Sequence, residues 1–214
     1  MTNLILIRHG QSVANEEDKF AGHSDFDLTD LGRKQAELAG EYVKKHFKVD
    51  AVYASDLKRA YNTAVPSARA FGLEVHGDKE LREIYAGDWE AMPFAQVISD
   101  YPADFALWKN DLEKAYCPNG ETVASLCERV CKEVCRIAEE HDGQTVLIAT
   151  HATPVRAVQS AASGESTSDI AFVANASINL FTYENGKLNI EKLNIVDHLG
   201  DLVTVLPGDF DKDN

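Results

Sequence analysis

Short apolar runs alternate along the chain with longer segments whose apolar residues recur at helical spacing. The runs lie at 3–7, 51–55, 73–76 and 145–150, and polar or turn-forming residues flank them. Runs of this length predict buried strands, because a helix or a membrane span needs more apolar residues. Strands that alternate with helical segments predict an α/β fold with parallel strands.

Two helices are expected between the first strands. Thr29 predicts the N-cap of a helix that runs to about residues 46–47, because its apolar residues share one face. Ser55 or Asp56 predicts the cap of a second helix, and Gly72 predicts its end.

The second half of the chain continues the pattern. Residues 94–116 are weakly helical with a break at 101–102, and residues 119–121 open a long helix to about His141. Thr153 predicts an N-cap because Pro154 suits a first helical position. Asn185-Gly186 predicts a type I′ hairpin between strands at 177–183 and 187–193.

Two segments have no hydrophobic period and predict loops over the strand ends. We interpret the chain as one domain, 1–214, with lid-like insertions at about 11–27 and 84–118 and a polar tail at 209–214.

Charge and composition narrow the possible partners. The net charge is −14, so no general basic field would attract nucleic acid or an anionic membrane. No secretory signal and no apolar stretch of membrane length is evident, so a cytoplasmic protein is expected. The sequence carries no signal for an oligomeric state.

Three of the four cysteines, Cys127, Cys131 and Cys135, share one helix face. They lack the Cys-x-x-Cys spacing of metal and redox sites, so together with Cys117 they predict buried, reduced thiols. No metal site is expected.

Histidines and arginines stand where the predicted strands end. Arg8 and His9 follow the first strand, Arg59 lies one turn into the helix after the second, and His151 follows the strand at 145–150. Ligands of open α/β sheets bind at the carboxyl ends of the strands, and guanidinium groups match phosphate oxygens. Parallel neighbouring strands would therefore form a phosphate site that contains a nucleophile.

The ordered motifs of the chain resemble the histidine phosphatase superfamily, in its phosphoglycerate-mutase-like branch. The resemblance covers nearly the whole chain and implies a three-layer α/β/α sandwich with a mostly parallel central sheet. The motifs are Leu-Ile-Arg8-His9-Gly10, Leu28-Thr29-x-x-Gly32-x-x-Gln35-Ala36, Ser55-Asp56-Leu57-x-Arg59-Ala60-x-x-Thr63-Ala64, Leu81-x-Glu83-x-x-x-Gly87-x-Trp89-Glu90, Gly120-Glu121 and Thr150-His151.

The resemblance implies a role for each site residue. His9 would attack phosphorus and become a phosphohistidine, while its other ring nitrogen donates to a backbone carbonyl. Arg8, Arg59 and His151 would hold the phosphoryl oxygens, and Asn15 matches a phosphate-binding position. Glu83 matches the general acid that protonates the leaving alkoxide and then activates water. No cofactor is implied.

Two positions depart from the family pattern. Ala152 follows the second histidine, where the family commonly has a glycine at the substrate pocket, so we expect a negative φ there. The Thr153 hydroxyl is expected to join the pocket. Ala91 replaces the glycine that often follows Trp-Glu.

The alternatives to a metal-independent phosphomonoesterase are a haloacid-dehalogenase-type phosphatase, a phosphoglycerate mutase and a non-catalytic phospho-ligand binding module. Asp25-Phe26-Asp27-Leu28-Thr29 matches the nucleophile motif of haloacid-dehalogenase phosphatases, but it follows a loop instead of a buried strand. A phosphoglycerate mutase would use the same phosphohistidine but needs more lid structure to exclude water. A binding module without catalysis would not need both His9 and Glu83.

The substrate is expected to be a small phosphorylated metabolite. The family acts on phosphorylated sugars, glycolytic acids and ribazole phosphate. Phe20, Tyr85 and Trp108 are candidates to cover an organic leaving group, and each is also compatible with an ordinary core position.

Overall fold

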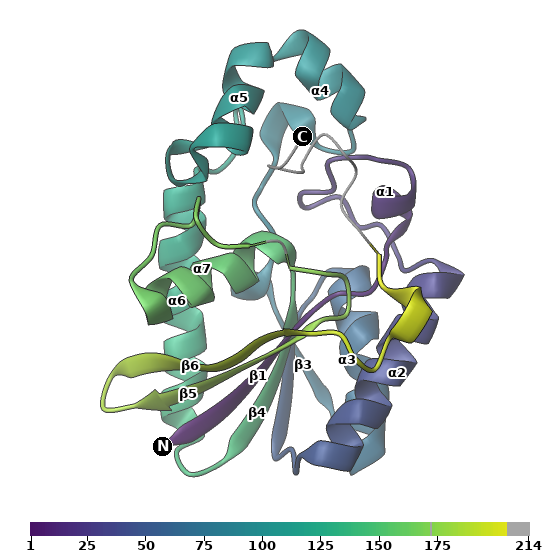
Figure 1. The fold of residues 1–214 in the computed structure, drawn as a ribbon, viewed down its shortest axis with the longest axis vertical. Helices are drawn as coiled ribbons and strands as arrows, with labels where there is room; N and C mark the ends of the chain where they lie inside the picture. Colours follow the sequence, from purple (N-terminus) through teal and green to yellow (C-terminus); the bar gives the residue numbers. More distant parts are fainter. Residues whose placement is uncertain (172, 205–214) are drawn as a thin grey trace.

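The strands form one six-stranded sheet with the order β3-β2-β4-β1-β5-β6 (Figure 1). The computed structural model describes residues 1–171 and 173–204. Strands β1 to β4 are mutually parallel, and β5 runs antiparallel to both β1 and β6. The strands are β1 (Thr2–Arg8), β2 (Ala51–Ser55), β3 (Val75–Asp78), β4 (Thr145–Thr150), β5 (Ile178–Glu184) and β6 (Lys187–Ile195).

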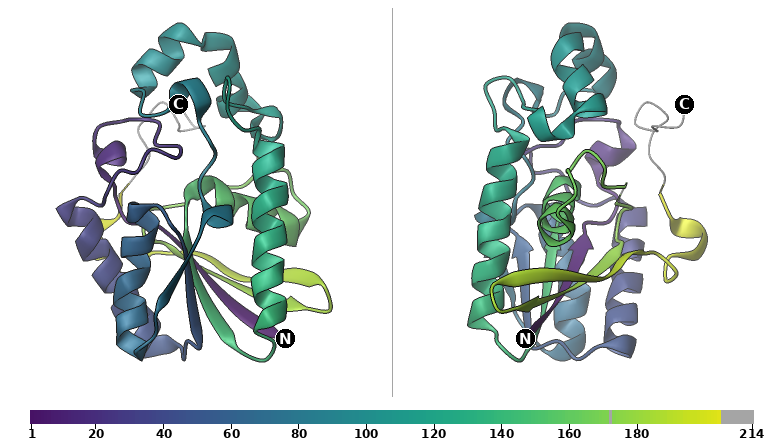
Figure 2. Two further views of the ribbon diagram at one scale, coloured as in Figure 1. Left: turned by 180° about the vertical axis from the view of Figure 1, so that it is seen from behind. Right: turned by 60° about the vertical axis from the view of Figure 1, so that its left-hand side comes forward.

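Helices cover both faces of this sheet, as the three-layer expectation required. Helices α2 and α3 pack on one face, and α6 and α7 pack on the other (Figure 2). The helices are α1 (Val13–Glu16), α2 (Asp30–His46), α3 (Lys58–Phe71), α4 (Phe94–Asp100), α5 (Pro102–Asn110), α6 (Val123–Glu140) and α7 (Ala152–Ser163). No helix in the described part of the chain has the length and apolar character needed to cross a membrane.

The central strand β1 shows why its sequence is apolar throughout. Successive side chains of a strand point to opposite faces, so Leu4 and Leu6 pack under α6 and α7 while Ile5 and Ile7 pack under α2 and α3. All four side chains are buried. A strand covered on both sides has no polar alternation, as is usual in parallel sheets.

Several sequence signals are confirmed at the element ends. The Thr29 side chain accepts a hydrogen bond from the Gly32 amide at the start of α2. Gly72 ends α3 in the left-handed conformation, with φ of 68°. Asn185 and Gly186 both have positive φ and connect β5 to β6.

Two predicted N-caps are wrong. The Asp56 side chain pairs with another residue, and Thr153 lies within the first turn of its helix. Leu57 is the N-cap of α3 and makes no side-chain cap, since the Asp56 carboxylate pairs with Arg82 instead. His151 is the N-cap of α7, which places Thr153 and Pro154 within its first turn.

Two further element boundaries and one predicted loop differ from the sequence expectations. The third strand begins at Val75, because the Leu73 amide still bonds the Ala68 carbonyl at the end of α3. Helix α6 starts after its N-cap Thr122. The 11–27 segment contains the short helix α1, capped by Ser12.

The two predicted insertions lie side by side beyond the carboxyl ends of the parallel strands (Figure 1). The Phe20 amide donates to the Met92 carbonyl at 2.9 Å, and the Ala91 amide donates to the Phe20 carbonyl at 2.9 Å. Ala91 has a φ of 59°, a left-handed conformation without a polar side chain to support it. The predicted polar tail at 209–214 lies outside the described residues.

We expect Ala91→Gly to stabilise the protein by about 0.5–1 kcal/mol, because glycine removes the left-handed strain of an alanine but costs some chain entropy. Ala70→Gly makes the same chemical change inside α3 and should destabilise by about 1 kcal/mol. Urea denaturation measures both free energies of unfolding. Destabilisation by Ala91→Gly equal to that of Ala70→Gly would contradict the prediction.

Candidate functional site

His9 lies directly after β1 and is buried. Its Nδ1 is 2.7 Å from the Gly10 carbonyl oxygen, which can only accept, so Nδ1 carries the ring proton. The neutral tautomer then keeps the lone pair on Nε2. The geometry therefore matches the expectation that a backbone carbonyl fixes the tautomer of this histidine.

The backbone around His9 is held by close packing. A Cβ on Gly10 would lie 2.4 Å from the carbonyl oxygen of Gly32, so α2 approaches this turn only because residue 10 is glycine. The Gly10 amide donates to Thr63 on α3 at 3.1 Å. The Asn175 side chain donates to the His9 carbonyl at 3.0 Å.

His151 stands beside His9 because β4 pairs with β1 in parallel. The two ring centroids are 5.1 Å apart with an edge-to-face angle of 65°. The His151 Nδ1 accepts from the Arg59 Nε at 3.2 Å, so it is Nε2 that donates to the Ser55 hydroxyl at 2.8 Å. The second strand contributes through Ser55, at the end of β2.

Two arginines add positive charge to this buried site. Arg59 is 1% exposed, and its guanidinium donates to the carbonyls of Gly22 at 2.7 Å and Ser24 at 2.9 Å. Arg8 is also buried and donates to the Val173 carbonyl. Burial lowers the pKa of each arginine to about 10, so both remain cationic at neutral pH.

The two histidines are held neutral. Burial is the largest cause that lowers the pKa of His9 and of His151 well below the usual value, and the charge of Arg59 adds to it. A neutral His9 is a nucleophile, whereas a protonated one is not. The arginines therefore help to keep His9 neutral and place positive charge beside it.

Glu83 reaches the same site from the irregular segment after β3. Its Oε2 accepts from the Thr153 amide in the first turn of α7 at 3.4 Å. Its negative charge opposes the lowering of the pKa of Arg8 and of Arg59. The structure thus brings a carboxylate together with both arginines and both histidines.

Asn15 and Ala152 border this cluster in different ways. The Asn15 side chain completes the capping box of α1 by accepting from the Ser12 amide at 3.0 Å. It also accepts from Asn175 at 3.3 Å, which places it near the His9 backbone. Ala152 is the first residue of α7, and its φ is not positive, as expected.

The aromatic candidates separate into core and surface. Phe20 packs edge-to-face on Trp89, Phe94 and Trp108 inside the insertions, which makes it a core residue. Tyr85 is 46% exposed and its ring lies 5.4 Å from that of His23.

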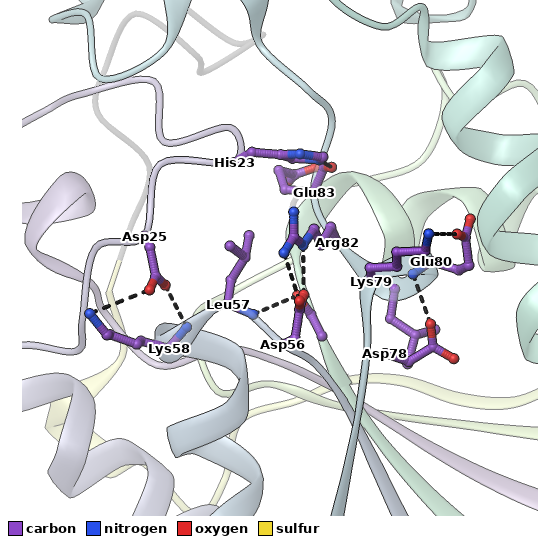
Figure 3. A network of polar contacts seen from close by, with 12 residues as sticks. His23, Asp25, Asp56, Leu57, Lys58, Asp78, Lys79, Glu80, Arg82 and Glu83 are labelled. Carbon is purple, nitrogen blue, oxygen red and sulfur yellow. Dashed lines mark hydrogen bonds and ion pairs between the residues drawn. The ribbon is translucent and has the colours of Figure 1, made fainter.

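The haloacid-dehalogenase-like motif has no place in this site. Asp25 pairs with Lys58, and Asp27 pairs with Arg33 (Figure 3 shows the first pair). Both aspartates lie in a loop, as the sequence indicated.

Three residues that support the site were given no role in it by the sequence-based prediction. Ser55 holds His151, Glu90 accepts from the amides of the 23–24 loop, and Arg129 holds the Glu83 segment. Ser55 and Glu90 stand inside the recognised motifs, which was a usable signal. Arg129 lies in the helical pattern with no local mark of its role.

The four cysteines are free thiols, as predicted, and Cys117 is buried while the other three are half-buried. Burial raises the pKa of the Cys131 thiol to about 12. Within residues 1–171 and 173–204, no group of three or more His, Cys, Asp or Glu side chains is arranged to hold a metal ion.

Comparison with protein families and sequences gives a consistent result. The model of the histidine phosphatase superfamily (branch 1) matches residues 4–196. Phosphoserine phosphatase 1 of Hydrogenobacter thermophilus is 37% identical over 94% of this chain and 96% of its own length. A metal-independent phosphoserine phosphatase of Arabidopsis thaliana is 30% identical over 100% of this chain and 89% of its own.

Solved structures show the same likeness. YhfR of Bacillus stearothermophilus superposes with a TM-score of 0.88 at 26% identity, covering 93% of this chain and 100% of its own. A mycobacterial glucosyl-3-phosphoglycerate phosphatase in complex with VO3 superposes with a TM-score of 0.82 at 27% identity, covering 91% and 99%.

We expect the free energy of unfolding to fall as pH decreases from about 6.5 to 5. His9 and His151 have lowered pKa values in the folded state, so in this range the unfolded chain binds more protons and is favoured. Each buried histidine contributes up to about 1.4 kcal/mol per pH unit. Urea denaturation at several pH values measures the slope, and His9→Asn should make it shallower. A slope unchanged by His9→Asn would contradict this assignment.

Proposed function

Because the chain belongs to the histidine phosphatase superfamily, we propose that it hydrolyses phosphomonoesters through a phosphohistidine formed on His9. The protein is a phosphoric monoester hydrolase that acts on small phosphorylated metabolites. The observation that carries the route is the contact of His9 Nδ1 with the Gly10 carbonyl, because it leaves Nε2 as the nucleophile in a site with two buried arginines.

In the first step, His9 Nε2 attacks phosphorus in line with the leaving oxygen. The N–P bond forms as the P–O ester bond breaks, and the leaving oxygen takes the proton of the Glu83 carboxyl. Arg8 and Arg59 stabilise the charge on the three remaining phosphoryl oxygens, and His151 donates to one of them once its Nε2–H turns from the Ser55 hydroxyl to the bound phosphoryl group. We further propose Asn15 and the Ala152 amide, at the N-terminus of α7, as phosphate contacts.

In the second step, water attacks the phosphohistidine. The Glu83 carboxylate takes a proton from this water as the new O–P bond forms and the N–P bond breaks. Inorganic phosphate leaves, and His9 returns to its neutral state. The relatives described above are phosphatases, so transfer to water is favoured over the return of the phosphoryl group to a substrate hydroxyl.

We propose that residues 1–214 act as one domain whose 11–27 and 84–118 insertions form the lid. Glu90 supports this role because its carboxylate joins the two insertions: it accepts from the amides of His23 at 2.7 Å, Ser24 at 2.7 Å and Ala86 at 2.9 Å. We also propose a cytoplasmic location, which the four free thiols support.

We propose phosphoserine as the first substrate to test. Two relatives that match over most of this chain are phosphoserine phosphatases, and a third is a phosphatase of glucosyl-3-phosphoglycerate. Both compounds are phosphate esters on a small skeleton with a carboxylate. The exposed Tyr85 and the half-buried His23 border the side of the site from which Glu83 would meet the leaving group.

His9→Ala should reduce the hydrolysis of p-nitrophenyl phosphate in EDTA by at least about a thousandfold, because the variant has no nucleophile. His76→Ala removes an exposed histidine on β3 and should leave the rate unchanged. Release of p-nitrophenolate measures both, and acid-labile, base-stable label from a 32P-substrate, trapped by rapid quenching, identifies phosphohistidine. Activity that requires magnesium and survives His9→Ala would overturn the mechanism.

Among phosphoserine, 3-phosphoglycerate, glucose 6-phosphate and ribazole phosphate, we expect phosphoserine to give the highest kcat/KM. The expected margin is at least about tenfold, the effect of one well-placed polar contact. Release of inorganic phosphate measures all four substrates on the same enzyme preparation. A preference for glucose 6-phosphate would contradict a substrate with a carboxylate.

A further inference from the structure

The segment that carries Glu83 is held in place by side chains. Arg129 on α6 donates to the carbonyls of Glu80 at 2.7 Å, Arg82 at 3.0 Å and Glu83 at 3.3 Å. The hydroxyl of Thr150, the last residue of β4, donates to the Leu81 carbonyl at 2.7 Å. Four consecutive carbonyls, from residue 80 to residue 83, therefore accept from side chains of other elements.

The Arg129 guanidinium is itself fixed by a bidentate ion pair with Glu121. Its Nε is 3.0 Å from Oε1 and its Nη2 is 2.8 Å from Oε2. The side chains are only 18% and 15% exposed, so water screens this pair less than a surface pair. Glu121 also binds Tyr85, two residues beyond Glu83. Its Oε2 accepts from the Tyr85 amide at 3.2 Å, and its backbone amide donates to the Tyr85 carbonyl at 2.9 Å.

Two further contacts hold the same segment, one from the connection between β2 and α3 and one from the first insertion. The Arg82 side chain forms two hydrogen bonds of 2.6 Å with Asp56, directly beside Glu83 in Figure 3. The His23 Nε2 donates to the Glu83 carbonyl at 2.9 Å. Among the described residues, Arg129 is nevertheless the side chain with the most contacts to the segment, since it donates to three of its carbonyls.

We propose that Arg129, held by Glu121, is a positioning residue for the Glu83 carboxyl. Arg82 and Glu83 belong to none of the strands and helices in the described part of the chain, so the place of the carboxyl depends on these side-chain contacts. The inference rests on the proposed function, in which this carboxyl gives its proton to the leaving oxygen. Proton transfer requires hydrogen-bond distance in the transition state, and a small displacement costs rate.

Lysine cannot replace Arg129 in this role. A guanidinium presents five donors in a rigid plane, and here they serve three carbonyls and a bidentate carboxylate. An ammonium keeps the charge but has three donors on a flexible stem. Arg129→Lys should therefore loosen the segment while it preserves the charge near the site.

The consequence can be measured through the leaving group. A poor leaving group such as phenolate needs the proton of Glu83, whereas p-nitrophenolate leaves with little help. The ratio of kcat/KM for p-nitrophenyl phosphate to that for phenyl phosphate therefore reports the contribution of the acid. The use of kcat/KM isolates the steps up to formation of the phosphohistidine. A general loss of folded or competent enzyme changes both values equally and leaves the ratio unchanged.

The experiment compares the intact chain with Glu83→Gln, Arg129→Lys, Glu121→Gln and Arg136→Lys. Arg136 is the matched control, because it also lies on α6 and pairs with carboxylates but is 45% exposed and makes no hydrogen bond to residues 80–83 within the described part of the chain. Glu121→Gln weakens the hold on Arg129 and leaves Arg129 itself in place. It therefore serves as the second variant if Arg129→Lys does not fold.

We expect Glu83→Gln to raise the ratio by about a hundredfold or more, in line with the loss of a general acid. Arg129→Lys should raise it by about tenfold, and Glu121→Gln should raise it in the same direction. Arg136→Lys should leave it unchanged. This order of effects would support the inference.

Two results would overturn it and can be told apart. An unchanged ratio in Glu83→Gln would remove Glu83 as the acid, and the proposed function would lose that step together with the inference. A raised ratio in Glu83→Gln with equal losses on both substrates in Arg129→Lys and Glu121→Gln would leave the function intact. It would show that Arg129 acts only on folding or on the fraction of competent enzyme.

Discussion

The burial of the Arg59 guanidinium is the constraint on which much of this structure depends. A buried cation is costly unless its donors are satisfied, and Arg59 is held by two backbone carbonyls and by His151. No ion pair of Arg59 occurs within residues 1–171 and 173–204. Its charge is therefore available to an anion, and it also lowers the pKa of both histidines.

The loop that supplies these carbonyls has to be held in turn. The Glu90 carboxylate accepts from the amides of His23 and Ser24. The His23 amide shares its peptide plane with the Gly22 carbonyl, so this contact orients that carbonyl toward Arg59. The aromatic cluster around Phe20 packs the two insertions together. Charge in the site and packing in the insertions are thus coupled through one short loop.

Much of the fold could be predicted from the sequence, because the residues that define each strand, cap and turn are close together in the chain. The uniformly apolar β1 and β4, the cap at Thr29, the end at Gly72 and the hairpin at Asn185 each depend on a few neighbouring residues, and the structure confirms them. The predicted cap at Asp56 is wrong for the opposite reason. Its carboxylate pairs with Arg82, 26 residues away, and no local pattern reveals that competitor.

The sequence by itself determined the succession of strands and longer helices along the chain, and the presence of His9, Arg59 and His151 at strand ends or one turn beyond. Those features follow from hydrophobic period and turn chemistry, which act over a few residues. Only the tertiary structure decided which groups hold the site: Ser55 against His151, Glu90 against residues 23 and 24, and Arg129 against the Glu83 segment. Such contacts join residues far apart in the chain, so they are determined by the packing of helices and insertions around the sheet and leave no periodic signal.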